Sequence, residues 1–435
     1  MTAVVGILNK RGIAIAADSA VTMSRGRKGE KIANSANKML RLTSANPISV
    51  MVTGSASLLG VPWDVIIRRY RQKRGNNSFP TVQACVNDFF SYIPTEPAFF
   101  EEDMVNRFLG YLISEFYDTI CRDVPEKEYD DDGNVTNEEE VFQVMNNAMR
   151  RISKKAKTVG TCQQFVDYDF ERFIAIAKDT IDQHFKEITA DDIPGPEQYS
   201  SGLTKKLRPI FDQCFYDFTM ARPIDGTTLV FSGYGESEEY PVLLHADVDG
   251  GFDKRTHYYI FEDEIVKISD DNPTAICPFA QADVMMGLLT GITPRYNREA
   301  INIAEESLSN YLASYINTKD NEGSPISPEI KKKLSSIKYN DLIRKFAKQN
   351  YRLRISERKQ WLKTLHDYDL QDMARLAENL ITITSFERHM TFSQEGVGGP
   401  IDLAVITKNN GFTWLNRKSW YHHKDVGGRY GKFGV

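Results

Sequence analysis

Residues Met1–Asp18 read MTAVVGILNKRGIAIAAD, and this stretch decides the fold of the chain. Its two apolar runs, Ala3–Leu8 and Ile13–Ala17, flank a polar tetrad at Asn9–Gly12. Apolar, β-branched runs on either side of an Asn- and Gly-containing tetrad are typical of a β-hairpin. The sequence therefore predicts that the chain opens with two paired antiparallel strands.

The register of this hairpin decides which side chains meet. If the turn centres on Lys10, Thr2 and Asp18 face each other across the two strands, within side-chain reach. Removal of Met1 would then bring a hydroxyl, a free α-amine and a carboxylate together. We expect an active site to begin at this point.

Composition and charge exclude several classes of function. The chain has 435 residues and 49.5 kDa, of which 41% are hydrophobic and 26% charged, as in an ordinary globular protein. A net charge of −5 and a pI near 5.9 predict no nucleic-acid partner. No apolar run reaches the roughly 18 residues of a membrane helix, so we expect no membrane segment. Because the first residues show no basic region or cleavage site, we expect no secretory leader.

Cysteine usage points to a reducing compartment. The five cysteines are widely spaced and form no CxxC pair. This pattern favours free thiols over disulfides or a zinc site, and we expect the protein to be cytoplasmic.

Strand and helix patterns alternate along the chain. Strand pairs come first, helices follow, and a last hairpin closes the sequence, which predicts an α+β fold of two antiparallel sheets with helical layers outside. A loop is expected at Met23–Ala36. A turn at Gly54–Ser57 is expected to lead into a helix at Leu58–Arg74, whose N-terminus would favour negative charge.

The expected divisions of the chain are a core (1–121), a mostly helical insertion (122–225), core (226–292), a second helical insertion (293–367), core (368–416) and a tail (417–435).

Several sequence words resemble the proteasome β-subunit family and its bacterial ring-peptidase relatives, which are N-terminal-nucleophile hydrolases. The resemblance implies an αββα four-layer sandwich. The matching words lie in the segments 1–74, 226–292 and 368–416, and they are Thr2–Ile7, Ala14–Ser19, Asn37–Leu42, Val52–Ala56, Leu229–Tyr234, Pro241–Asp247 and Gly398–Ile406.

The resemblance assigns a role to each matching residue. Thr2 would be the nucleophile after removal of Met1, with its own α-amine as general base, since an α-amine titrates at about 7.7–8.0. Lys38 would favour the alkoxide form of the Thr2 hydroxyl, and Asp18 would pair with Lys38. The backbone N–H of Gly54 would stabilise the tetrahedral oxyanion. The positions of the family's specificity pocket are Ala36, Val52 and Ala56, which suit an apolar side chain.

The chain departs from the family at two auxiliary positions. The family carries a Ser before its third helix and an Asp-x-x-Ser near its last strand, and these positions fall here near Ala280–Gln281 and Gln394–Val397. Gln281 or Glu395 are the candidates to replace them.

The resemblance implies a threonine endopeptidase without cofactor, acting on polypeptides, assembled as a homo-oligomeric ring and served by an ATP-dependent unfoldase. The missing auxiliary residues leave two alternatives open. One is a proteasome-like scaffold or binding subunit without catalytic activity, which a retained Met1 would support. The other is an N-terminal-nucleophile amidase that acts on a small molecule.

Two further segments have the composition of metal sites. Glu128–Glu139 has the acids and central glycine of a calcium loop, but Pro125 interrupts the entering helix, and a solvated acidic loop is the preferred interpretation. His422-His423 lies in a basic, aromatic tail that is more typical of a surface segment. We therefore predict no metal site.

Overall fold

The computed structural model describes residues 3–25, 28–33, 37–124, 136–187, 201–223, 226–316, 327, 329, 340–391 and 398–418. The chain forms two compact units, the first made of Met1–Lys38 with Lys267–Val435 and the second of Met39–Val266. Each unit contains one large antiparallel sheet, a two-stranded one and its own helices, so the chain is of the α+β class.

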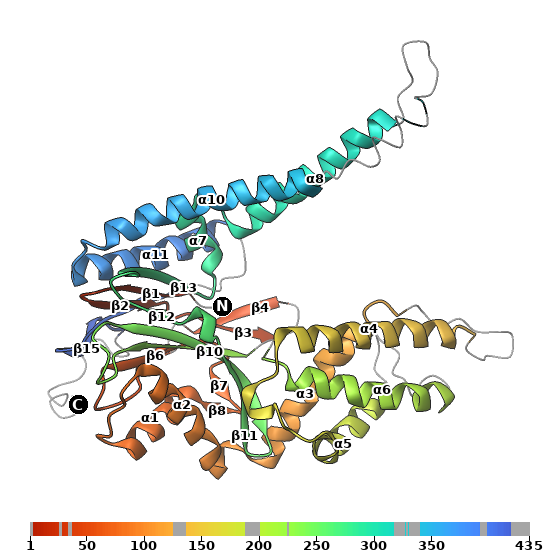
Figure 1. Ribbon diagram of the computed structural model, residues 1–435. Coiled ribbons are helices and arrows are strands. Elements are labelled where there is room, and N and C mark those ends of the chain that lie inside the picture. The colour runs from red at the N-terminus through yellow and green to blue at the C-terminus, as the bar shows by residue number, and fades with distance from the viewer. Residues whose placement is uncertain are drawn as a thin grey trace. The chain divides into compact units, whose positions relative to one another are not determined.

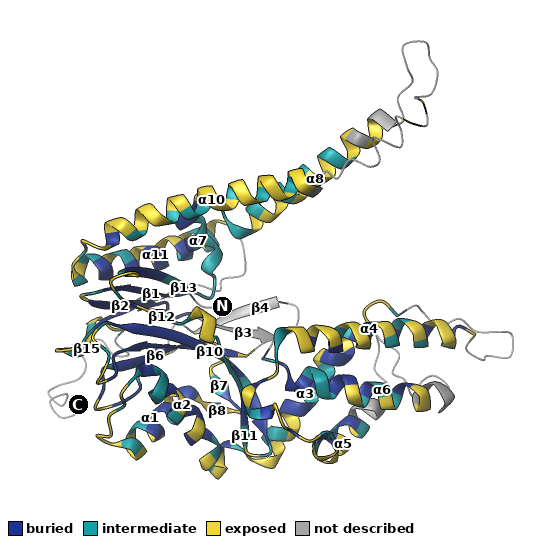
Figure 2. Cartoon of the chain, viewed as in Figure 1, coloured by how far each residue is buried: buried dark blue, intermediate teal, exposed yellow. Residues whose placement is uncertain are grey.

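The first unit is built on a five-stranded sheet with the strand order β13-β1-β2-β14-β15. The strands β1 and β2 are buried along their whole length, and Figure 2 shows them in the colour of buried residues. The elements of this unit are β1 (Val4–Asn9), β2 (Gly12–Ala17), β3 (Val21–Arg25), β4 (Lys28–Ala33), β13 (Thr274–Phe279), α7 (Ala282–Thr290), α8 (Pro294–Ile316), α10 (Asn340–Leu365), α11 (Leu370–Met390), β14 (Asp402–Thr407) and β15 (Gly411–Asn416).

The N-terminal hairpin is confirmed, but the expected register is wrong by one residue. Val4 pairs with Ala17 and Asn9 with Gly12, so Asp18 stands opposite Ala3 and not opposite Thr2. The reason is Asn9, which belongs to the strand and caps a two-residue turn: its Oδ1 accepts from the N–H of Arg11 at 2.9 Å. The side-chain amide of Asn9 also donates to backbone carbonyls at the end of α10 and just after it, which holds the residue in place.

Helices cover one face of this sheet. Figure 1 shows α7, α10 and α11 along the same side of β1, β2 and β13. The apolar face of α11, with Met373, Ala377 and Leu380, packs on the small residues Ala14 and Ala16 of β2. Small residues on β2 let the helix approach closely. This packing holds the end of β2, after which the candidate site begins.

The second unit is built on a sheet with the order β11-β10-β9-β6-β5, with β12 (Val266–Lys267) paired to β10. A large aromatic core joins this sheet to its helices, and α1 and α2 lie along one face (Figure 1). The other elements are β5 (Met39–Arg41), β6 (Ile48–Gly54), β7 (Ser57–Leu58), β8 (Val61–Pro62), α1 (Trp63–Arg74), α2 (Val82–Tyr92), α3 (Glu102–Cys121), α4 (Glu138–Val159), α5 (Phe170–Glu187), α6 (Ser201–Met220), β9 (Thr227–Gly233), β10 (Val242–Phe252) and β11 (Arg255–Ile260), with the 3-10 turns η1 (Ile93–Thr95), η2 (Pro97–Phe99), η3 (Gln163–Phe165) and η5 (Glu262–Glu264).

Two expectations about local structure are wrong. The segment expected as a loop at Met23–Ala36 contains the paired strands β3 and β4. The helix expected from Leu58 begins only at Trp63, because Leu59 and Gly60 turn the chain with positive φ between the short strands β7 and β8. The Gly54–Ser57 turn therefore does not lie at the N-terminus of a helix.

No helix among the described ranges is both long and apolar enough to span a bilayer.

Candidate active site

Asp18 is the centre of the polar cluster at the start of the first unit. The residue directly follows β2 and is fully buried. Its Oδ1 accepts from the backbone N–H of Ala3 at 2.9 Å, and its Oδ2 accepts from Ala20 at 3.3 Å and Gly398 at 3.0 Å. A buried carboxylate needs such partners because burial removes its hydration. Three backbone donors from three segments fix the carboxylate in one orientation.

Lys38 completes an ion pair with this carboxylate. Its Nζ lies 2.8 Å from Asp18 Oδ1, and the residue is 5% exposed. Burial lowers the pKa of Lys38 below its ordinary value, although the charge of Asp18 opposes the shift. The nearby ammonium of Lys418 lowers this pKa further. The lysine is therefore a desolvated cation whose proton is held less tightly than that of a surface lysine.

Thr2 lies outside the described residues, but its neighbour Ala3 belongs to the cluster. The backbone of Ala3 makes two hydrogen bonds with Asp18: its N–H donates to the side-chain carboxylate, and its carbonyl accepts from the backbone N–H of Asp18 at 3.1 Å. The Ala3 nitrogen is covalently bonded to the carbonyl carbon of Thr2, and adjacent Cα atoms are about 3.8 Å apart. Thr2 is thus joined directly to the residue that contacts Asp18.

A second buried pair, which sequence reasoning missed, adjoins the first. Asp402, 2% exposed, opens β14 opposite Ala17 of β2. Lys418 follows β15, donates from Nζ to Asp402 Oδ2 at 3.0 Å and to Ser19 Oγ at 3.2 Å, and donates its backbone N–H to Asp402 Oδ1 at 2.9 Å. The sequence signal was a lone carboxylate at the start of an otherwise apolar strand, which at a buried position needs a cation.

The residues expected to form the oxyanion donor and the substrate pocket belong mostly to the second unit. Gly54 ends β6 with a φ of +83°, and a Cβ at this position would meet the carbonyl oxygen of Gly226 at 2.1 Å. Val52 packs in the aromatic core of that unit, and Ala56 is exposed. Ala36 lies outside the described residues.

The auxiliary position near Ala280–Gln281 lies beside the start of β1. Phe279 of β13 pairs with Val4, so the two residues that follow it reach the level of Ala3. Ala280 and Gln281 both have left-handed backbone angles, with φ of +45° and +43°, which is uncommon for residues other than glycine. Strain of this kind concentrates at functional sites. Glu395, the other candidate, lies outside the described residues.

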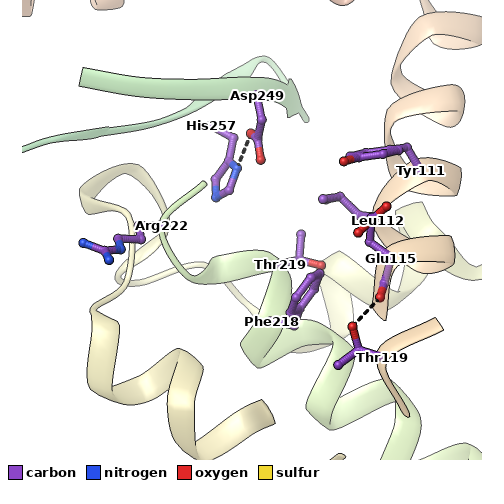
Figure 3. Close-up of a pocket in the computed structure, with 9 residues that line it drawn as sticks. All are labelled: Tyr111, Leu112, Glu115, Thr119, Phe218, Thr219, Arg222, Asp249 and His257. Carbon is purple, nitrogen blue, oxygen red and sulfur yellow. Dashed lines mark hydrogen bonds and ion pairs between the residues drawn. The ribbon is translucent and has the colours of Figure 1, made fainter. Parts of the chain in front are cut away.

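The second unit contains a different polar constellation, shown in Figure 3. A cavity of about 80 Å³ is lined by Tyr111, Leu112, Glu115, Thr119, Phe218, Thr219, Arg222, Asp249 and His257. The His257 ring lies 2.6 Å from Asp249 Oδ1 through Nδ1 and 2.8 Å from the carbonyl oxygen of Ala221 through Nε2. Cys162, also close to the ring, is fully buried.

This constellation is structural. Burial by itself lowers the pKa of His257, but the adjacent Asp249 carboxylate more than offsets this, and the pKa lies well above its ordinary value. Both ring nitrogens then donate, one to a carboxylate and one to a carbonyl, so neither can act as a general base. The imidazolium ties β10 and β11 to the end of α6. Within the described part of the chain, no three His, Cys, Asp or Glu side chains are grouped as metal ligands.

No family model matches the chain, and no curated protein matches it in sequence. The solved structures that it resembles include Anbu from Hyphomicrobium sp. strain MC1. The Gly-1 mutant of Anbu aligns over 96% of this chain and 86% of that chain, at 10% identity and a TM-score of 0.30. A second Anbu structure aligns over 96% and 89%, at 10% identity and a TM-score of 0.26. The alignment is broad, but at these values no statement about function rests on it.

A buried cation beside the first residues of the chain lowers the energy of negative charge that develops there. Asp18 keeps that cation in position without exposing it to water. Such a site is suited to activating a hydroxyl at the chain terminus.

Proposed function

We propose that this protein is a threonine-type peptidase of the proteasome-like family, in which Thr2 is the N-terminal nucleophile once Met1 is removed. The observation that carries the proposal is the buried Asp18–Lys38 pair, hydrogen-bonded to the backbone of Ala3. A hydroxyl is a weak nucleophile until a base takes its proton and a positive charge stabilises the oxygen. The α-amine and Lys38 would supply these two effects.

In the proposed reaction the Thr2 hydroxyl attacks the scissile carbonyl carbon, and its proton passes to the α-amine of the same residue. The proton then goes to the leaving amine as the peptide bond breaks, and water hydrolyses the resulting ester. Lys38 would favour the alkoxide, and the Gly54 N–H is proposed as the donor to the oxyanion. Ala36, Val52 and Ala56 are proposed to line an apolar substrate pocket, with Gln281 and Glu395 in auxiliary positions.

The wider proposal follows the same family. It comprises an αββα four-layer sandwich, a homo-oligomeric ring, unfolded polypeptide as substrate and an ATP-dependent unfoldase as partner. The five free cysteines suit the proposed cytoplasmic location. Light scattering of the purified chain measures the assembly directly, and a monodisperse monomer at micromolar concentration would refute the ring.

The test of the catalytic proposal uses mass and labelling together. Intact-mass measurement is expected to show the loss of Met1, and a peptide epoxyketone or boronate is expected to modify Thr2. Thr2→Ala should abolish both labelling and peptide cleavage. The exposed Thr413→Ala on β15 is the matched control and should keep them. Equal turnover by Thr2→Ala would end the proposal.

One observation favours a second function. The family's auxiliary serines are replaced here by Gln281 and by the residues near Gln394–Val397, which suits a scaffold without chemistry. A retained Met1 together with a lack of labelling would support that scaffold. Labelling of Thr2 without cleavage of any peptide would instead support an amidase for small molecules.

A further inference from the structure

Helix α10 carries a concentration of positive charge that the proposed peptidase does not use. Its 26 residues contain eight arginines and lysines but only two acids, Asp341 and Glu357. The whole chain, by contrast, has a net charge of −5. A solvated helix usually mixes both signs at neighbouring positions. The excess on α10 is therefore a local feature with its own cause.

Six of these cations form one line, here called the basic stripe. At 100° per residue they fall within an arc of about 100°, and at 1.5 Å per residue they span about 28 Å. All six are exposed. The residues of the basic stripe are Arg344, Lys345, Lys348, Arg352, Lys359 and Lys363.

The basic stripe faces away from the rest of its unit. Asn350 donates to Asn297 of α8 at 2.6 Å, and the buried Leu365 lies in the core beneath the helix. Both residues lie about 110–170° around the helix from the middle of the stripe. In Figure 2, α10 is largely in the colour of exposed residues. The stripe is thus open to a partner along its length.

Among the described residues, one acid contacts the stripe. Arg344 lies 3.8 Å from Asp341, and none of the other five cations has a carboxylate within ion-pair distance among the residues that the structure describes. Like charges one turn apart, such as Lys348 with Arg352, destabilise a helix by a few tenths of a kcal/mol each. An external polyanion would remove this repulsion.

The spacing of the stripe matches a nucleic acid better than an acidic protein. Six charges over about 28 Å give one per about 5 Å, against one per 3.4 Å along a nucleic-acid strand. Tyr351, 60% exposed, borders the stripe and offers a ring for base stacking. The exposed apolar residues Leu342 and Leu353 lie more than a quarter turn from the middle of the stripe, so the stripe and these residues do not face one bilayer surface together.

We propose that the basic stripe of α10 binds the sugar–phosphate backbone of a nucleic acid. The overall acidity of the chain does not oppose this, because screening confines charge interactions to about 10 Å at 0.1 M salt. The proposal is independent of the peptidase, and it is tested equally well in the Thr2→Ala protein.

The experiment measures binding of fluorescein-labelled 20-nucleotide single-stranded DNA and 20-base-pair duplex DNA by fluorescence anisotropy. The test variant is Lys348→Gln/Arg352→Gln/Lys359→Gln. The control, Arg151→Gln/Lys154→Gln/Lys155→Gln, removes the same charge from exposed positions on α4. Thermal melting confirms that both variants fold. The two DNA probes distinguish a single-strand from a duplex partner.

Wild-type and control proteins are expected to bind at 50 mM salt and to weaken steeply towards 200 mM. The test variant should bind at least tenfold more weakly, with a salt slope reduced by about 2–3. Equal affinity of test and control variants would overturn the proposal, as would no binding at 50 mM salt. Binding to phosphatidylserine vesicles but not to DNA would overturn it in favour of a membrane surface. A smaller oligomer in the test variant, without DNA binding, would overturn it in favour of a second copy of the chain.

Discussion

Lys418 Nζ lies 3.0 Å from Asp402 Oδ2 and donates to Ser19, the residue next to Asp18 in the chain. This contact brings a second ammonium close enough to the site to lower the pKa of Lys38, in addition to the effect of burial. A residue that follows the last strand thereby lowers the pKa of a lysine near the start of the chain. Lys418 is in this sense a positioning residue for the candidate site.

Replacing Lys418 by Met should raise the pKa of Lys38, because a like charge is removed and the carboxylate of Asp402 remains. If Lys38 must be protonated to support the Thr2 alkoxide, the alkaline limb of the pH–rate profile moves to higher pH. The rate of covalent labelling of Thr2 measures this limb. Lys418→Arg keeps the positive charge and should leave the alkaline limb at the wild-type pH. Equal alkaline limbs in the Met and Arg variants would contradict the prediction.

Replacing Lys38 by Met should lower the rate of peptide cleavage by about 10²–10³, the usual cost of losing one group that stabilises developing negative charge. The Michaelis constant should change little, because the effect acts on the transition state. Lys10→Met, in the turn of the same hairpin, is the matched control and removes a partly exposed lysine. A Lys38→Met enzyme as active as the control would show that Lys38 is only structural.

Replacing His257 by Gln should destabilise the second unit by about 3–5 kcal/mol, because Asp249 stays buried without its cation. Since the folded-state pKa of His257 is raised, its stabilising contribution is complete below the unfolded pKa of about 6.5. The contribution is lost as pH rises through the raised folded-state pKa. Denaturant unfolding between pH 6 and pH 10 should show the difference from wild type shrinking.

The control for this prediction is His366→Gln, which changes an exposed histidine beside Asp367. It should alter stability little at any pH. A pH-independent difference between His257→Gln and wild type would contradict the charged state assigned to His257.

Replacing Gly54 by Ala should cost clearly more stability than Gly75→Ala. Both glycines have positive φ, for which a side chain costs about 1–2 kcal/mol. Only at Gly54 would the added Cβ meet a backbone oxygen, that of Gly226, whereas at Gly75 it meets nothing within 4 Å. Thermal unfolding of the two variants compares them directly. Equal melting temperatures would show that the strand ends can separate without cost.

The sequence predicts the strands that carry the site better than their register. The two apolar runs and the Asn9–Gly12 tetrad suffice to predict the hairpin, because both are local signals. The pairing of Ala3 with Asp18 depends on the side chain of Asn9, which bonds to a helix end more than 350 residues later. No local pattern contains that contact. The register predicted from the sequence therefore differs from the observed one by one residue.

The site residues divide in the same way. The family resemblance paired Asp18 with Lys38, and the two side chains bond in the structure, although their catalytic role stays a prediction. Asp402 and Lys418 were missed because a pair is visible only when β14 and the segment after β15 fold beside β2. The basic residues of α10 are present in the sequence, but the net charge of the whole chain is negative. A prediction from net charge alone therefore overlooks their local excess.

The sheet of the first unit places β2 between β1 and β14, which are separated by most of the polypeptide. During synthesis the opening hairpin therefore leaves the ribosome long before its neighbouring strand exists. The carboxylate of Asp18 gains the N–H of Gly398 only when nearly the whole chain has been made. A nascent chain therefore cannot complete the hydrogen bonds of Asp18, and with them the proposed peptidase site, until its last strands have been made.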